Sequence, residues 1–197
     1  MKYYKFLTAD NTGEYSGFDF TEYLPKNGKP GKWLPLIETL EECETGYHFC
    51  DKNNIAEWCN SQLFEIEYKG SIIHADKKHV AQQVRFVKKI IKWNNKNARL
   101  AACDIAEQIA MVVWNKHYPD DKRPQNAIDT ARRFANGKAN KEELAAAWDA
   151  ARAAAWDAAR AEARDAAWDA ACAAAMAVAM DAAWAAANKI ICKYAGI

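Results

Sequence analysis

The sequence predicts an α+β protein with a small mixed strand-and-helix domain over residues 1–95 and an all-α, alanine- and tryptophan-rich helical bundle over residues 96–197. Two observations carry this prediction. Up to about residue 75, short aromatic and β-branched runs alternate with turn residues, which is typical of strands. After the polar run "NNKN" at 94–97, apolar residues recur at helical spacing between proline and glycine stops.

Composition and charge are those of a globular protein, for which we expect a cytoplasmic location and no membrane span. Hydrophobic residues make up 51% and charged residues 27% of the chain, values typical of globular proteins. No bulky apolar run reaches the length of about 18 residues that a transmembrane helix needs, and the start has no apolar signal-peptide core. The six cysteines lie singly, which favours free thiols over a disulfide framework.

Within the first domain, "KYYKFLT" at 2–8 and "QLFEIEYKGSIIHA" at 62–75 are predicted strands, the second broken at Gly70. Between them, "NGKPGKW" at 27–33 is a turn cluster. A glycine-centred turn follows in 42–59, and then a short helix capped around Asp51–Asn54.

Residues 77–93, "KKHVAQQVRFVKKIIKW", are predicted to form an amphipathic helix. Val80, Val84, Val87 and Ile91 fall on one stripe at helical spacing. Basic residues fall on the opposite face and are the candidate phosphate-binding residues: Arg85, Lys88, Lys89 and Lys92. A solvent-exposed helix face without a ligand is the alternative interpretation.

Proline and glycine delimit the next two predicted helices. The first covers 98–118, is apolar on two sides and stops at Pro119. The second starts at Pro124, which suits the first helical turn, and ends at Gly137, which suits the position after a helix.

From Asn140 to Tyr194 the chain is rich in alanine and has no glycine or proline. Asn140 and Glu143 match the capping-box pattern of a helix start. Large or charged residues then recur every fourth position, Trp148 and Trp156 among them, and this spacing winds them around a helix of 3.6 residues per turn. A single helix would span ~80 Å at 1.5 Å per residue, so we expect a break near Glu162–Asp165. Most tryptophans are expected to pack internally, with one or two exposed at an interface.

The segment "ACDIAEQIAMVVWNKHYPDDKRPQNAIDTARRFANG", followed by the Ala/Trp/Asp/Arg repeats, resembles a family of predicted immunity proteins, described as immunity-five-like, of bacterial and phage genomes. The resemblance covers about residues 98–187. The first part, through "YYKF", "CETGYHFC" and "HADKKHVAQQVRFVKKI", is similar to a second uncharacterised domain of phage proteins, without the glycine expected after "YKF". The resemblance implies a helical domain that neutralises a toxin or a defence component. It points to the following residues: Cys103, Asp104, Pro119, Asp121, Arg123, Pro124 and Arg132.

No residue pattern predicts catalysis, a metal site or a cofactor. The cysteines and histidines of the first domain lack paired Cys-x2-Cys spacing, and Cys103 has no base within its helix. No glycine-rich phosphate loop occurs. In the "PDDKRP" turn, Asp120 and Asp121 precede a helix and are expected to cap it. Arg123 and Arg132 either bind a carboxylate or phosphate, or pair with Asp104 and Glu107 and lock the helices together.

We therefore expect a non-enzymatic binding protein, encoded by a phage or mobile element, that neutralises a toxin or antiviral defence factor by occluding it. The candidate ligand- or partner-binding residues are Asp104, Glu107, Trp114, Asp121, Arg123, Arg132, Trp148 and Trp156. One alternative is a protein that sequesters a nucleotide immune signal in an Arg/Lys/Trp pocket. A second is an enzyme whose first domain resembles a degenerate ADP-ribosyltransferase. Whether the chain forms a homo-oligomer is left open.

Overall fold

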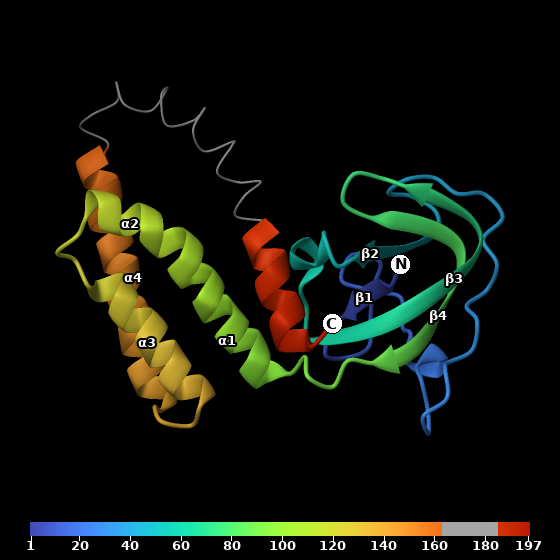
Figure 1. The fold of residues 1–197 in the computed structure, drawn as a ribbon, viewed down its shortest axis with the longest axis horizontal. Helices are drawn as coiled ribbons and strands as arrows, with labels where there is room; N and C mark the ends of the chain where they lie inside the picture. Colours follow the sequence, from blue (N-terminus) through green and yellow to red (C-terminus); the bar gives the residue numbers. More distant parts are fainter. Residues whose placement is uncertain (163–184) are drawn as a thin grey trace. The chain divides into compact units, whose positions relative to one another are not determined.

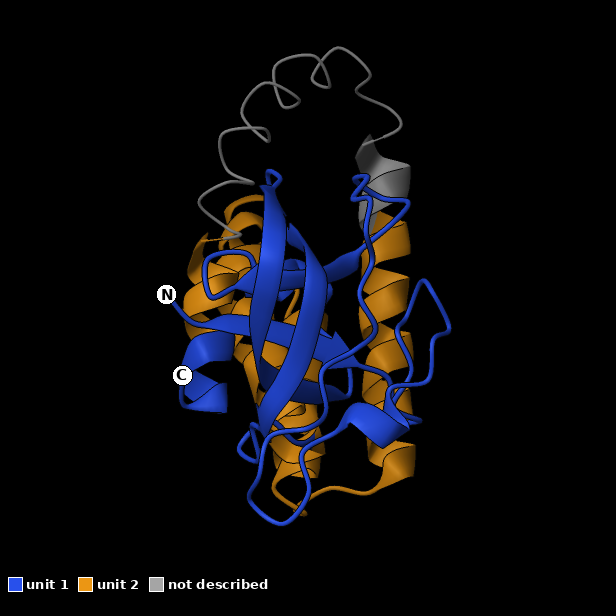
Figure 2. Ribbon diagram, turned by 90° about the vertical axis from the view of Figure 1, so that its right-hand side faces the viewer, with its two compact units in different colours: residues 1–94, 191–197 blue, residues 95–190 orange. Residues whose placement is uncertain are grey.

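The computed structural model describes residues 1–162 and 185–197, which belong to two compact units (Figure 1, Figure 2). Unit 1 comprises residues 1–94 and 191–197, and unit 2 comprises residues 95–190. Strands form unit 1 and helices form unit 2, so the predicted α+β class is confirmed. Residues 191–197 differ from the expectation, because they belong to unit 1: the Cys192 thiol lies 3.7 Å from the carbonyl oxygen of Lys52.

Unit 1 is a closed antiparallel sheet of four strands: β1 (Tyr3–Leu7), β2 (Tyr47–Asp51), β3 (Gln62–His74) and β4 (His79–Lys89). The strand order is β1-β2-β4-β3, and β1 closes the sheet by pairing with both β2 and β3. Two 3-10 turns, η1 (Thr21–Tyr23) and η2 (Ile55–Trp58), lie in the connections. The predicted strands near 2–8 and 62–75 and the short helix after Asp51 are therefore confirmed, although β3 continues through Gly70 with a register shift.

Alternation along the strands places one set of side chains in the core of unit 1. The largest fully buried side chains include Phe64 and Phe86, whose rings meet edge to face at 5.3 Å. The whole cluster comprises Leu7, Phe20, Leu34, Phe49, Phe64, Ile66, Ala81, Val84 and Phe86.

The predicted helix over 77–93 is wrong, because His79–Lys89 is strand β4. Its residues pair in register with β3, for example Val84 with Tyr68 and Phe86 with Ile66. Valine, isoleucine and phenylalanine suit strands as well as a helical stripe, and the β3 partner supplies the ladder hydrogen bonds that decide between them. Directly after β4, Ile90 is buried, whereas Ile91, which the helical pattern placed on the apolar stripe, is 82% exposed.

Unit 2 contains the helices α1 (Asn95–Ile105), α2 (Met111–His117), α3 (Arg123–Ala135) and α4 (Lys141–Glu162). A π-helical segment, η3 (Ala106–Ala110), joins α1 to α2, so the predicted helix over 98–118 is present with a widened turn in it. The helix α3 packs against both α1 and α4. Residues 185–195 are also helical. The predicted break after Glu162 lies outside the described residues.

Three helix boundaries are confirmed by their backbone geometry. Pro124 lies in the first turn of α3, and Gly137 follows the helix with φ +71°, a left-handed conformation that glycine adopts without strain. At the start of α4, the Asn140 side chain accepts from the Glu143 N–H at 2.7 Å, and Glu143 accepts from the Asn140 N–H at 2.8 Å. This is the reciprocal capping box. No helix in the described part of the chain is both long and apolar enough to span a bilayer.

Candidate functional site

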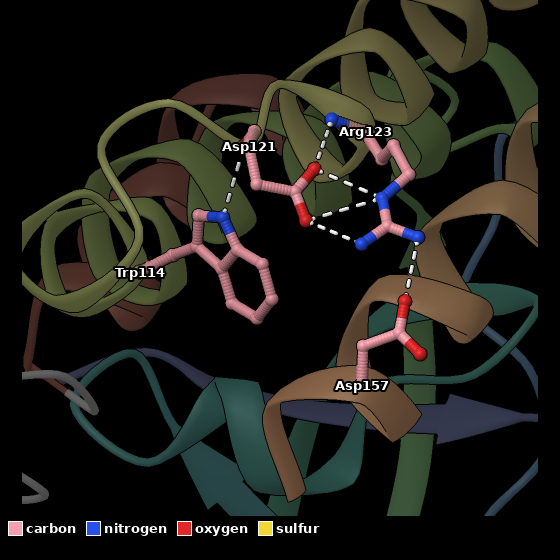
Figure 3. A network of polar contacts seen from close by, with 4 residues as sticks. All are labelled: Trp114, Asp121, Arg123 and Asp157. Carbon is pink, nitrogen blue, oxygen red and sulfur yellow. Dashed lines mark hydrogen bonds and ion pairs between the residues drawn. The ribbon is translucent and has the colours of Figure 1, made fainter. Parts of the chain in front are cut away.

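Four side chains form a polar network around the turn between α2 and α3 (Figure 3). The Asp121 carboxylate accepts from Arg123 through two parallel contacts, Nε–Oδ1 at 3.0 Å and Nη2–Oδ2 at 2.6 Å. The opposite nitrogen of Arg123 donates to Asp157 of α4 at 2.9 Å. The Trp114 indole donates to the backbone carbonyl of Asp121 at 3.0 Å. The network thus connects α2, the start of α3 and α4.

The Asp121 carboxylate also caps α3, because its Oδ1 accepts the backbone N–H of Arg123 at 3.0 Å. The side-chain and backbone hydrogen bonds from Arg123 hold the pKa of Asp121 below its usual value of 3.8. Hydrogen bonds to Asp121 and Asp157 raise the pKa of Arg123 in turn. A lowered carboxyl pKa stabilises the fold above the usual pKa, and this contribution is lost as pH falls through the lowered value.

An Arg123→Met variant is expected to raise the pKa of Asp121 toward its usual value, because the carboxylate loses its bidentate donor. The measurement is a pH titration of the Asp121 side-chain carboxyl carbon by NMR. Lys122→Met is the matched control, since the Lys122 ammonium donates to the carbonyl of Pro119 and not to Asp121. An unchanged Asp121 titration in Arg123→Met would contradict the assigned network.

A second network is centred on Arg132 of α3. Its Nη2 donates to Asp104 of α1 at 2.8 Å and to Glu107 of η3 at 2.6 Å. Gln125 also donates to Glu107, at 3.2 Å. Desolvation lowers the pKa of Arg132, but the hydrogen bond and charge of Glu107 and the charge of Asp104 outweigh it, so the pKa is raised overall. Of the two alternatives that the sequence left open, pairing with Asp104 and Glu107 holds for Arg132, whereas Arg123 pairs with Asp121 and Asp157 instead.

Both arginines therefore use their guanidinium groups on carboxylates of the same unit. Such contacts tie helices together, and they occupy Nε, Nη1 and Nη2 of Arg123 and Nη2 of Arg132. Cys103, beside Asp104, is buried, and burial raises the pKa of its thiol. A thiol of raised pKa is a poor nucleophile, so these networks are suited to structure rather than to nucleophilic chemistry.

The candidate residues Trp148 and Trp156 lie on the surface of α4, where Trp156 directly precedes Asp157 of the first network. Their exposed fractions are 64% and 63%. Ala154 of the same helix faces inward instead and is 1% exposed. The described part of α4 thus presents two tryptophans to solvent, in agreement with the expectation of one or two exposed tryptophans. Trp168 and Trp184 lie outside the described residues.

The candidate phosphate-binding residues Arg85, Lys88, Lys89 and Lys92 do not form a helix face, because Arg85, Lys88 and Lys89 belong to β4. Arg85 forms an ion pair with Glu67, and its guanidinium lies over the Trp33 ring. The ammonium of Lys88 lies 3.3 Å from the Glu65 carboxylate. The expected basic helix face is therefore wrong, because these residues lie on a strand.

Unit 1 contains a cavity of about 390 Å³. The sequence pattern did not predict it. The signal that could have suggested it is Lys5, a cation between Tyr4 and Phe6 in an otherwise apolar strand. Burial lowers the pKa of Lys5 to about 8. A half-buried titratable group with a shifted pKa beside a cavity is a feature of binding and active sites.

Within the described residues, no three histidine, cysteine or acidic side chains cluster closely enough to hold a metal ion. Comparison of the chain with protein-family models, with curated proteins and with solved structures found no match.

Proposed function

We propose that this chain is a non-catalytic binding protein that neutralises a toxin or an antiviral defence factor by occluding it, and that α4 carries the contact surface. The exposed pair Trp148 and Trp156 is the observation that carries the proposal. The wider assignment to an immunity-like protein of a phage or mobile element rests on the resemblance of residues 98–187.

The tryptophan pair has the properties of a protein-binding anchor. Residues eight apart on a helix are about 12 Å apart and rotated by about 80°, so both indoles lie on one broad side of α4. Tryptophan is enriched among residues that dominate binding energy, because it buries a large apolar area and has one polar N–H. Both indoles are exposed to solvent, and burying them against a partner would be favourable.

The charges near the pair indicate the chemistry of the partner. Asp149 and Arg152 form an exposed ion pair at 3.1 Å between the two indoles. Glu142 and Glu143 lie at the start of the same helix. Acidic residues therefore outnumber basic ones along this part of α4. A partner with an apolar pocket and a basic rim fits this surface.

Sequestration of a nucleotide signal has less support from the described residues. Its candidate groups Arg123 and Arg132 already pair with carboxylates, and the Trp114 indole N–H bonds to a backbone carbonyl. A cytoplasmic location is part of the proposal, and the free thiols of the described cysteines support it: Cys43, Cys50, Cys59, Cys103 and Cys192. We also infer that the described helices of unit 2 form a helical bundle, which the packing of α3 on α1 and α4 supports.

A Trp148→Ala/Trp156→Ala variant is expected to bind its target at least about 100-fold more weakly, since anchor residues contribute about 2–4 kcal/mol each. A photo-crosslinking phenylalanine at position 148 would first capture the target in cells that produce toxins or defence factors. Affinity and inhibition of the purified target are then compared between the native chain and the variant. The melting temperature is expected to stay unchanged, because both indoles are exposed.

Ile91→Ala is the matched control, because Ile91 is an exposed apolar residue of unit 1. It is expected to leave affinity and inhibition unchanged. Equal inhibition by the double variant and the native chain would overturn the proposal. So would a dimer, detected by light scattering, that dissociates in the double variant, because a second copy would then be the partner.

A further inference from the structure

The cavity of unit 1 lies where β1 and β2 part. β1 pairs with β3 along its whole length, from Tyr3 to Leu7. Its recorded pairing with β2 covers only Tyr3 with Asp51 and Tyr4 with Cys50. Beyond Tyr4 the two strands leave a space of about 390 Å³, within the range of small-molecule sites. Its walls come from β1, β2, the loop at 13–16, Cys43, Trp58 and Lys78.

The main charge at this cavity is the Lys5 ammonium. It donates to the backbone carbonyl of His48 at 2.7 Å and lies 5.3 Å from the centre of the Phe20 ring. No carboxylate in the described part of the chain lies within ion-pair distance of it. Lys5 is half-buried, and a partly desolvated charge without a counter-ion is unfavourable. An anion bound in the cavity would pair with the Lys5 ammonium.

The neighbouring groups leave the positive charge uncompensated. Burial, followed by the charges of Lys5 and Lys78, lowers the pKa of His48. Its buried Nε2 has no hydrogen-bond partner among the described residues. Lys78 adds a second ammonium, which donates to Cys43 and lies 3.7 Å from the exposed Glu42. At the rim, the Glu14 carboxylate accepts from Asn60 at 3.1 Å.

Several aromatic side chains line the wall as well. Phe49 is buried beside Lys5, and the Tyr15 and Trp58 rings meet edge to face at 6.2 Å. Aromatic walls favour a flat ring, which stacks or packs edge to face. We infer that this cavity is a binding site for a small aromatic anion, whose negative charge pairs with the Lys5 ammonium. This site is independent of the α4 surface proposed above.

The fluorescent sulfonate 8-anilinonaphthalene-1-sulfonate is a suitable probe, and its uncharged analogue N-phenyl-1-naphthylamine reports the contribution of the rings alone. The full chain is expected to bind one sulfonate probe at least about 10-fold more tightly than the analogue. Lys5→Met is expected to remove this preference. Lys2→Met, which removes an exposed charge near the same strand, is expected to change it less than about 2-fold.

Lys5→Met is expected to fold. Because the pKa of Lys5 is lowered to about 8, the folded chain holds this proton less tightly than the unfolded chain, and the charge opposes folding at neutral pH. Methionine keeps the length of the side chain without the charge. Circular dichroism verifies the fold, and Lys5→Arg, which keeps the charge, is expected to retain sulfonate binding.

Sulfonate affinity is also expected to fall as pH rises through about 8, because Lys5 loses its proton there and the attraction to an anion is lost. A Lys78→Met variant separates the contribution of the second ammonium. The groups that face Lys5 or line the cavity with it are Tyr4, Glu14, Tyr15, Cys43, His48, Cys50 and Lys78. Burial raises the pKa of Cys50, so its thiol stays neutral over this range.

Amide chemical shifts locate the probe, and the expected changes centre on Lys5 and His48. Displacement of the probe by benzoate would identify a carboxylate ligand, and displacement by phenyl phosphate a phosphate ester. Equal sulfonate affinity in Lys5→Met and the native chain would overturn the inference. Shift changes confined to the surface of α4 would overturn it as well.

Discussion

A Phe86→Ala variant is expected to lose about 3–5 kcal/mol of the free energy of unfolding of unit 1, the range for a fully buried phenylalanine. The Phe86 side chain is 0% exposed, and its ring packs edge to face on Phe64 at 5.3 Å and on Phe20 at 5.4 Å. Alanine would leave a cavity among rigid rings that cannot close over it. Denaturant unfolding of the full chain, followed by hydrogen exchange of unit 1 amides, measures the loss.

Ile91→Ala is the control that tests the strand as well as the core. An amphipathic helix over 77–93 would bury Ile91 on the same apolar side as Phe86. In the strand structure Ile91 is 82% exposed, and its replacement is expected to change the free energy of unfolding by less than about 0.5 kcal/mol. Equal losses for the two variants would contradict β4.

An Arg132→Met variant is expected to lower the free energy of unfolding of unit 2 by about 1–3 kcal/mol, the range for lost hydrogen bonds to charged groups. The change leaves Asp104 and Glu107 without their shared donor, and the Asp104 side chain is only 15% exposed. The partial exposure of Arg132 keeps the effect below that of a fully buried pair. Thermal unfolding of the full chain, read from helical circular dichroism, measures it.

Arg152→Met is the matched control. Arg152 pairs with Asp149 on the exposed surface of α4, and such pairs contribute about 0–1 kcal/mol. A double-mutant cycle with Asp104→Asn isolates the Arg132–Asp104 interaction. If Arg132→Met kept full stability but lost target binding, Arg132 would belong to the contact surface instead of the helix junction.

Local backbone chemistry made several elements predictable from sequence. Proline suits a first helical turn, glycine suits the residue after a helix, and an asparagine–glutamate pair caps a helix start. Pro124, Gly137 and the Asn140–Glu143 pair follow these rules. The β3 strand was equally clear, because strict alternation of apolar and polar residues identifies a strand without knowledge of its partner.

The identity of β4 and the exposure of the tryptophans depend on contacts between distant residues. The apolar spacing of 80–91 fits a helix and a strand alike, and pairing with β3 decides between them. Along α4 the helical pattern shows where large and small residues lie, but it does not show which side of the helix packs on α3. Close helix packing favours small side chains at the contact, so alanine lies inward, and Trp148 and Trp156 lie outward.

By itself the sequence determined the α+β class and most helix boundaries, because these depend on local capping and period, and it offered Asp104 and Glu107 as one of two alternatives for the partners of Arg132. Only the tertiary structure decided that Arg123 holds Asp157, that residues 191–197 belong to unit 1, and that Lys5 borders a cavity. These features arise where segments far apart in sequence meet, as at the parting of β1 and β2. No local sequence pattern predicts such a contact, because its free energy depends on both segments together.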